Sequence, residues 1–389
     1  MKKVLVLLLV LVLGISLAGL ANAKKVGIVL DVGGRGDLSF NDMGFKGTDQ
    51  AAKDFGLEMD VAQSSTAADY LPNLRNMART GDYDLILCIG FLLGDALTAA
   101  AEEFPNQKFA IIDSVVDAPN VMSIVFRENE QSALIGALAA MAAAENDYKY
   151  AGIVLGIEIP TLYHFEAGFR FGMDWGLKKY AEVTGKTADV GLLYTYTGTF
   201  SDIAQGKAAT EAMLAQGAVG VYNVAGPLGV GDLQAISEAH TNAGTTFGAP
   251  YYFGVDSDQD WMGNGYHALA SGMKRVDNAC YSAVKSVLDG TFQGGIVSLG
   301  LKENGVAISG LSQLADFIDF GIAGGAVKSD DFYNIIANWA QDRATVPAYI
   351  WNAIDELEAG ILSGDIVVPT ANTSDEMAAV RAEYTLGAP

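Results

Sequence analysis

The sequence predicts an α/β protein made of two Rossmann-like lobes with parallel sheets. Short apolar runs alternate with longer amphipathic stretches, 50% of the residues are hydrophobic, and 389 residues are enough for two domains. We expect strands buried on both faces at residues 26–30, 85–89, 109–112, 151–155, 219–223 and 252–255. Apolar residues at helical spacing predict helices over 44–55, 70–80, 95–104, 131–145, 165–184 and 203–216. This alternation requires crossover connections, and hence parallel sheets.

The predicted strands and helices form two similar runs, one before and one after about Phe126. No low-complexity linker separates them, so we expect several short crossings that together make a hinge. The chain is expected to return to the first lobe after Asp256 and to cross again near 299–310. The tail should carry one helix around Trp339 and another over 347–360. The predicted division is lobe 1 at residues 24–126 and 257–305, and lobe 2 at 127–256 and 306–389.

Residues 1–23 have the organisation of a secretory signal peptide. Lys2 and Lys3 precede an apolar run that ends in Ala21-Asn22-Ala23, a pattern typical of signal-peptidase cleavage. The alternative is a membrane anchor, because the run is almost long enough to span a bilayer. No cysteine lies near the cleavage point. We therefore expect a periplasmic protein that begins near Lys24 and has no direct membrane anchor.

The charge balance is strongly acidic. Without Lys2 and Lys3, the 24 basic residues fall to 22 against 46 acidic ones, which leaves a mature charge of about −24. Such a surface repels nucleic acid, so no nucleic-acid partner is expected. Cys88 and Cys280 have the option of a disulfide after export, but both lie in apolar segments and we interpret them as buried thiols.

The sequence contains no complete motif for catalysis or metal binding among those considered. Residues 256–267 begin like a calcium loop, but Trp261 replaces the required glycine and His267 replaces the final glutamate. The three histidines are scattered and form no zinc motif. S-x-x-K patterns start at Ser271 and Ser282, but no K-T-G follows them. We expect no metal, no cofactor and no enzymatic activity.

The most informative loop follows the first predicted strand. It reads Asp31-Val-Gly-Gly-Arg-Gly-Asp-Leu-Ser-Phe-Asn-Asp42, and its glycines lack the G-x-G-x-x-G spacing of a dinucleotide site. Glycines also let a backbone pass close to a ligand. Because ligands of parallel sheets bind at the carboxyl ends of strands, this loop is a candidate binding segment.

A series of short motifs runs along most of the chain, from Lys25 to about Val284. In order, they are Gly-Ile-Val-Leu-Asp-x-Gly-Gly, Ser-Phe-Asn, Ile112-Asp113, Pro119-Asn120-Val121, Leu-Ile-Gly-Ala-Leu-Ala-Ala, Gly198-Thr-Phe-Ser-Asp202, Gly226, Gly254-Val-Asp256 and Lys274-Arg275-Val276. With these motifs the chain resembles the basic membrane protein family, whose members are purine nucleoside receptor-like solute-binding proteins with a type I periplasmic-binding fold. Gln131 stands where the family's pattern has glycine, and the family's lipid-anchored cysteine is missing.

The resemblance implies a nucleoside whose base lies between Phe40 and Phe200. Offset stacking on an aromatic ring adds about 0.5–1.5 kcal/mol beyond burial, although an isolated Phe more often packs in a core. Asn41 and Asp113 are expected to hydrogen-bond the base edge. The remaining positions expected around the base or the ribose are Asp31, Gly226, Asp256 and Lys274. Asp31 and Asp113 have the alternative role of helix N-caps.

The function that the resemblance implies is that of a periplasmic solute-binding protein of an ABC importer. It would bind a nucleoside such as adenosine, guanosine or inosine as a monomer and deliver it to permease subunits. The alternatives are a binding protein for another small polar solute such as a sugar, an enzyme acting on nucleosides, and a sensor subunit.

Overall fold

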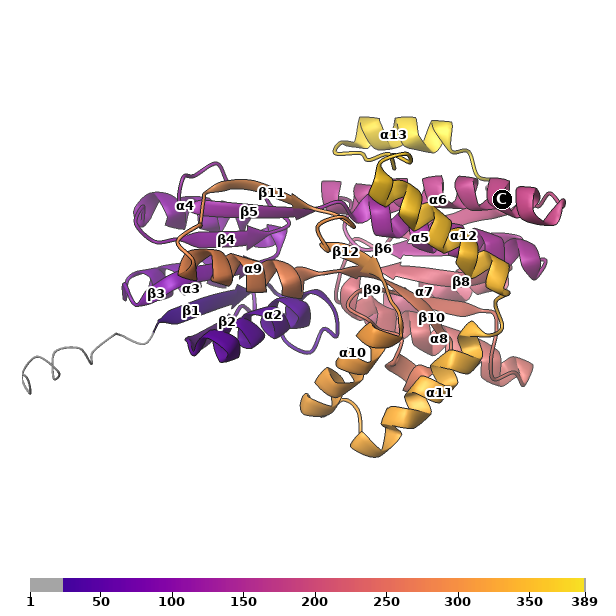
Figure 1. Cartoon of the computed structure of the whole chain (residues 1–389), viewed down its shortest axis with the longest axis horizontal. Coiled ribbons are helices and arrows are strands. Elements are labelled where there is room, and N and C mark those ends of the chain that lie inside the picture. The colour runs from indigo at the N-terminus through magenta and orange to yellow at the C-terminus, as the bar shows by residue number, and fades with distance from the viewer. Residues whose placement is uncertain (1–23, 388–389) are drawn as a thin grey trace, which may run out of the picture.

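The computed structural model describes residues 24–387 and contains two lobes, each built on a six-stranded sheet (Figure 1). The first sheet is parallel throughout, in the order β11-β5-β4-β3-β1-β2. Its strands are β1 (Lys25–Leu30), β2 (Glu58–Gln63), β3 (Tyr83–Ile89), β4 (Phe109–Ile112), β5 (Val121–Phe126) and β11 (Gly295–Leu299). The helices of this lobe are α2 (Phe40–Phe55), α3 (Tyr70–Ala78), α4 (Gly94–Glu103) and α9 (Val276–Leu288).

The second sheet has the order β12-β10-β9-β8-β6-β7, and only β12 runs antiparallel to its neighbour. Its strands are β6 (Tyr150–Leu155), β7 (Gly191–Tyr196), β8 (Ala218–Val224), β9 (Tyr251–Asp256), β10 (Ala268–Lys274) and β12 (Val306–Ile308). The helices between them are α5 (Glu128–Glu145), α6 (Pro160–Thr184), α7 (Ile203–Ala215) and α8 (Gly229–Ala243). The predicted α/β class with two parallel-dominated lobes is therefore confirmed.

Helices α5 and α6 pack closely because glycines line their contact. A Cβ on Gly136 would lie 2.3 Å from the carbonyl oxygen of Phe169, and one on Gly172 would lie 2.0 Å from that of Ala133. Nearly all of α5 is buried as a result, which explains why its sequence is apolar on every side. This close packing holds the first turn of α5 next to the cleft described below.

The predicted boundary after Asp256 is wrong, because the chain does not return to the first lobe there. Residues 257–267 lead instead into β10, which pairs in parallel with β9 and places Met273 beside Asp256. Small and polar residues in β10 hid this strand from the apolar pattern. The chain returns only at residues 274–276, and its other crossings are at 126–128 and 299–306.

The C-terminal part of the chain adds four helices, which Figure 1 shows on the side of the second lobe. They are α10 (Leu311–Ala323), α11 (Phe332–Arg343), α12 (Ala348–Ser363) and α13 (Ser374–Glu383). The helices predicted around Trp339 and over 347–360 are thus confirmed as α11 and α12. Helix α12 packs on α5 and α13 packs on α6.

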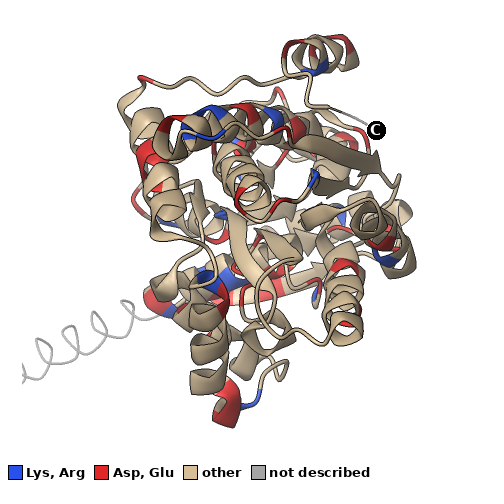
Figure 2. Ribbon diagram, turned by 90° about the vertical axis from the view of Figure 1, so that its right-hand side faces the viewer, with Lys and Arg blue, Asp and Glu red and all other residues tan. Residues whose placement is uncertain are grey.

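The sequence-based expectations on export, thiols and charge have different outcomes. The predicted signal peptide, residues 1–23, lies outside the described residues. Within residues 24–387, no helix combines the length and apolarity needed to cross a membrane. Cys88 and Cys280 are buried and free, as interpreted. Figure 2 shows acidic residues on many of the helices and loops of this side of the molecule, with basic residues among them.

Candidate functional site

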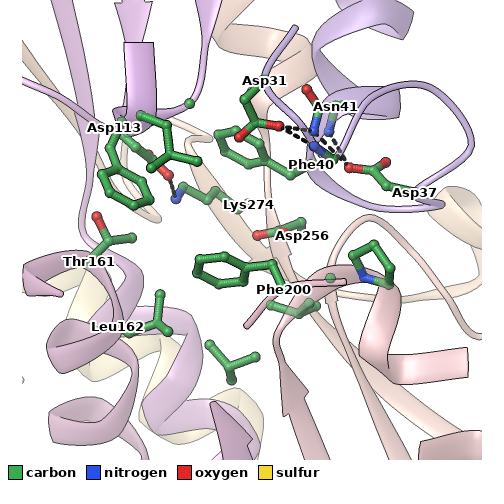
Figure 3. A pocket seen from close by; sticks show the side chains of 18 of the residues that line it. Asp31, Asp37, Phe40, Asn41, Asp113, Thr161, Leu162, Phe200, Asp256 and Lys274 are labelled. Carbon is green, nitrogen blue, oxygen red and sulfur yellow. Dashed lines mark hydrogen bonds and ion pairs between the residues drawn. The ribbon is translucent and has the colours of Figure 1, made fainter. Parts of the chain in front are cut away.

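A cavity lies between the carboxyl ends of the strands of the two sheets (Figure 3). Asp31 and Asp113 follow β1 and β4 in the first lobe, whereas Asp256 and Lys274 end β9 and β10 in the second. Parallel strands carry their carboxyl ends to one edge of each sheet, which is why these residues meet. The structure brings all eight sequence-predicted site residues to this cavity: Asp31, Phe40, Asn41, Asp113, Phe200, Gly226, Asp256 and Lys274.

The amide of Asn41 is held in one orientation by two carboxylates of its own loop. Its Nδ2 donates to Oδ1 of Asp31 at 2.8 Å and to Oδ2 of Asp37 at 3.1 Å. Both of its N–H groups are therefore used. Its Oδ1 is buried and has no hydrogen-bond partner among residues 24–387. Asn41 thus offers the cavity an acceptor, not a donor.

Asp37 stabilises the N-terminus of α2, the helix-capping role that was an alternative for Asp31. Its carboxylate accepts hydrogen bonds from the backbone N–H groups of Ser39, Asn41 and Asp42. Burial, reinforced by the nearby carboxylate of Asp42, raises the pKa of Asp37 to about 7. The carboxylate thereby fixes the turn from which Phe40 and Asn41 reach the cavity.

Lys274 is the cation of the site and is 1% exposed. Its Nζ forms an ion pair with Asp113 and lies 3.0 Å from Oε1 of Glu128. Burial alone would lower the pKa of Lys274, but the charges of Asp113, Glu128 and Asp256 raise it. Burial raises the pKa of Asp113 to about 7 although the lysine acts against this rise. The ammonium is therefore charged, and carboxylates surround it.

Two of the aspartates around Lys274 have a left-handed backbone conformation. Asp113 has φ 67° and Asp256 has φ 62°, a left-handed conformation that costs a residue other than glycine roughly 1–2 kcal/mol. Asp256 accepts a hydrogen bond from Oγ of Ser39 at 2.9 Å, which links the two lobes. Oδ1 of Asp113 is buried without a partner among the described residues. Like Asn41, Asp113 leaves a free acceptor at the cavity.

The two predicted aromatic residues come from different lobes. Phe40 begins α2, and Phe200 lies in the loop between β7 and α7. Figure 3 shows their rings on opposite sides of Lys274 and Asp256. The ring of Phe200 rests on Gly156, where a Cβ would approach it to 2.2 Å. The glycine thus sets how deep this ring sits.

Gly226 contributes backbone to the cavity just after β8. It has φ 55°, and a Cβ added to it would meet no atom within 4 Å. The requirement for glycine is therefore conformational, not a matter of space. Nδ2 of Asn223 donates to the carbonyl oxygen of Gly226 at 3.0 Å and holds this turn.

Sequence reasoning missed several residues at or behind the cavity. Asp37 and Phe165 line it, and Glu128 contacts Lys274 from behind. His164 lies one layer further out, with Nδ1 at 2.8 Å from Oε2 of Glu128. Asp37 lies in the loop of residues 31–42, which was already a candidate binding segment, so it could have been predicted from the sequence. Glu128 and His164 carry no local signal, because only the packing of α5, α6 and β10 brings them to Lys274.

Comparisons with known proteins agree with the fold. A solved structure of ABC transporter solute-binding proteins from Aeropyrum pernix K1 is 34% identical, with a TM-score of 0.81, over 93% of this chain and 97% of that one. A solute-binding protein of Conexibacter woesei, at 20% identity and a TM-score of 0.60, shares the fold. The ABC transporter nucleoside-binding protein BmpA of Lactococcus lactis is 32% identical over 72% of this chain and 80% of its own length.

One relative bears on the question of a membrane anchor. An uncharacterized lipoprotein of Pyrococcus abyssi is 38% identical over 94% of this chain and 89% of its own length. The expectation that the protein has no membrane anchor is therefore unsupported.

The family assignment comes from a model of the Bmp family, described as ABC transporter substrate-binding protein PnrA-like, which matches residues 24–320. The chain belongs to this family of ABC transporter substrate-binding proteins.

Proposed function

We propose that this protein binds a nucleoside, with a purine base, in the cavity between its lobes and delivers it to the permease subunits of an ABC importer. The observation that carries the proposal is the pair Phe40 and Phe200, which reach the same cavity from different lobes. A planar base between them would be stacked on both faces and would hold the lobes together. The relative from Lactococcus lactis, whose name states nucleoside binding, supports the same ligand class.

The polar groups divide into two sets that suit the two halves of a nucleoside. Asp31 and Asn41 form one set beside Phe40, and the free Oδ1 of Asn41 would accept an N–H of the base. Asp113, Lys274 and Asp256 form the other set. Carboxylates and an ammonium group accept from and donate to the two hydroxyls of a ribose.

This division changes one detail of the expectation from sequence. Asp113 was expected at the base edge together with Asn41. Because Asp113 pairs with Lys274, we now assign it to the ribose. Of the residues expected around the base or the ribose, we assign Asp256 to the ribose, and Asp31 to the base through its contact with Asn41.

Calorimetry with adenosine, guanosine, inosine and their free bases tests the proposal. Asp256→Ala should weaken nucleoside binding by about 1.5–3 kcal/mol, the range for hydrogen bonds to charged groups, and should affect the free bases much less. Asp189→Ala, an exposed carboxylate of the second lobe, is the matched control. Free ribose tests the sugar alternative. Absence of nucleoside binding by the folded wild type would refute the proposal.

The setting of the protein follows from its family. Substrate-binding proteins of ABC importers work outside the cytoplasmic membrane, and we propose that this one acts there, in the periplasm, as a monomer. Release of the bound ligand by denaturation, followed by mass spectrometry, would identify the solute directly.

A further inference from the structure

The ion pair at the cavity continues into a chain of polar groups behind it. Glu128 is the first residue of α5, is 1% exposed and does not line the cavity. Its Oε1 lies 3.0 Å from Nζ of Lys274, and its Oε2 lies 2.8 Å from Nδ1 of His164. One buried carboxylate is therefore shared between a lysine and a histidine.

The ring of His164 meets oxygen acceptors at both nitrogens. Nδ1 faces Glu128, and Nε2 lies 3.2 Å from Oδ1 of Asn372. Both nitrogens can donate only when the ring is a protonated imidazolium. Burial and the charge of Lys274 lower the pKa of His164, but Glu128 and Asn372 outweigh them and raise it. Asn372 lies beyond residue 320, in the part of the chain outside the family match.

We propose that Glu128 and His164 are positioning residues for Lys274, and that the charge on His164 tunes ligand affinity. The inference rests on the proposed function, because it assigns Lys274 to the ligand. An ammonium group has three N–H donors, and Asp113 and Glu128 take two of them. The third is left for a ligand atom in the cavity.

The direction of the effect follows from the charges around the imidazole ring. Glu128 of α5 and Lys274 of β10 face His164, and Asn372 adds a neutral amide. Arg127 and Glu130 line the groove beside His164, but they pair with each other at 2.5 Å. When His164 loses its proton, Glu128 keeps Lys274 as its only cationic partner within this chain of groups. The lysine is then drawn toward Glu128 and away from the ligand.

A titration without ligand tests the coupling itself. The NMR signal of the His164 ring proton gives the pKa of this side chain in the wild type and in Glu128→Gln. We expect the pKa to fall by about one unit in the variant, because the glutamine side chain would keep a hydrogen-bond acceptor but lose the charge. An unchanged pKa would overturn the inference, and this measurement does not depend on the identity of the ligand.

Adenosine affinity as a function of pH tests the link to binding. We expect the wild-type Kd to rise about three- to tenfold as His164 deprotonates, which corresponds to a ligand-linked pKa change of about half to one unit. His164→Asn keeps a donor to Glu128 without the charge, and should lose this component. His240→Asn, on α8 far along the chain from these groups, should keep it.

Asp37 and Asp113 also titrate near neutrality, but they are present in all three proteins, so the difference between profiles isolates His164. Identical profiles for the wild type and His164→Asn would overturn the inference. If adenosine does not bind, guanosine and inosine replace it as the probe. If none of the three nucleosides binds at any pH, the proposed function is wrong and the binding part of the inference falls with it. The NMR titration then still decides whether Glu128 sets the charge of His164.

Discussion

Asp113 at the cavity and Asp232 in the second lobe are buried carboxyl groups with the same titration behaviour and different surroundings. Burial raises the pKa of each to about 7. Each has one oxygen without a partner among residues 24–387. Asp113, however, pairs with Lys274 and faces the cavity, whereas Asp232 accepts a single hydrogen bond from Thr210 where α7 meets α8.

The comparison shows that a perturbed pKa does not by itself identify a binding site. Desolvation acts on both carboxyl groups because both are surrounded by protein. What differs is that Asp113 has a buried cation as its partner and lines the cavity. The carboxyl group of Asp113 can accept a hydrogen bond from a ligand in the cavity, whereas Asp232 lies where α7 meets α8.

Removal of the cation should produce the largest effect. Lys274→Met would leave Asp113 and Glu128 buried without their shared partner. Breaking a buried ion pair from one side costs about 3–5 kcal/mol of unfolding free energy, and we expect a loss in this range from urea titrations at neutral pH. A loss below about 1 kcal/mol would show that Lys274 does not hold these carboxylates in the native state.

Substitution of Asp232 should have an intermediate effect of opposite sign. The native protein keeps this carboxyl group protonated up to about pH 7, while the unfolded chain releases the proton near the ordinary value of 3.8. Native Asp232 therefore binds more protons in this interval, and its contribution to stability falls as the pH rises. At about 1.4 kcal/mol per pKa unit, the rise from 3.8 to about 7 corresponds to roughly 4 kcal/mol at pH 8. Burial of the amide offsets part of this gain, so Asp232→Asn should be more stable than wild type at pH 8 by about 1–3 kcal/mol.

Urea unfolding of wild type and Asp232→Asn at pH 4.5 and pH 8 would measure this change. The stability difference between the two proteins should be much smaller at pH 4.5, which lies just above the pKa of the unfolded carboxyl group, than at pH 8, which lies above the pKa of the native one. Asp113→Asn is the contrasting variant, because it also removes an ion pair with Lys274 and should not stabilise the protein at pH 8. If Asp113→Asn and Asp232→Asn increase the unfolding free energy at pH 8 by the same amount, the proposed difference between the two carboxyl groups is wrong.

Removal of an exposed ion pair should change the unfolding free energy least, and it serves as the control for Lys274→Met. Lys178 pairs with Asp174 one turn away on α6, and its side chain is 75% exposed. Lys178→Met should change the unfolding free energy by less than about 0.5 kcal/mol, because water screens such i,i+4 pairs. A cost comparable to that of Lys274→Met would mean that loss of a lysine, not its burial, explains the first result.

Most of the cavity was predictable because its residues stand at strand ends. Asp31, Asp113 and Asp256 follow or end apolar runs that only buried strands explain. Where the pattern was weak, prediction failed. The segment Ala268–Lys274 contains small and polar residues, so β10 was not recognised and the lobe boundary was placed too early. A strand that is covered on both faces by close neighbours does not need large apolar side chains.

Local periodicity and the order of strands in the sequence were enough to predict the fold class, and the family resemblance supplied the residues expected at the cavity. Which polar groups are partners, by contrast, depends on how distant segments pack. The folded chain pairs Asp113 with Lys274, and it brings Glu128, His164 and Asn372 together from three distant segments. Such contacts join residues that are far apart in the sequence, so neighbouring residues carry no pattern that predicts them.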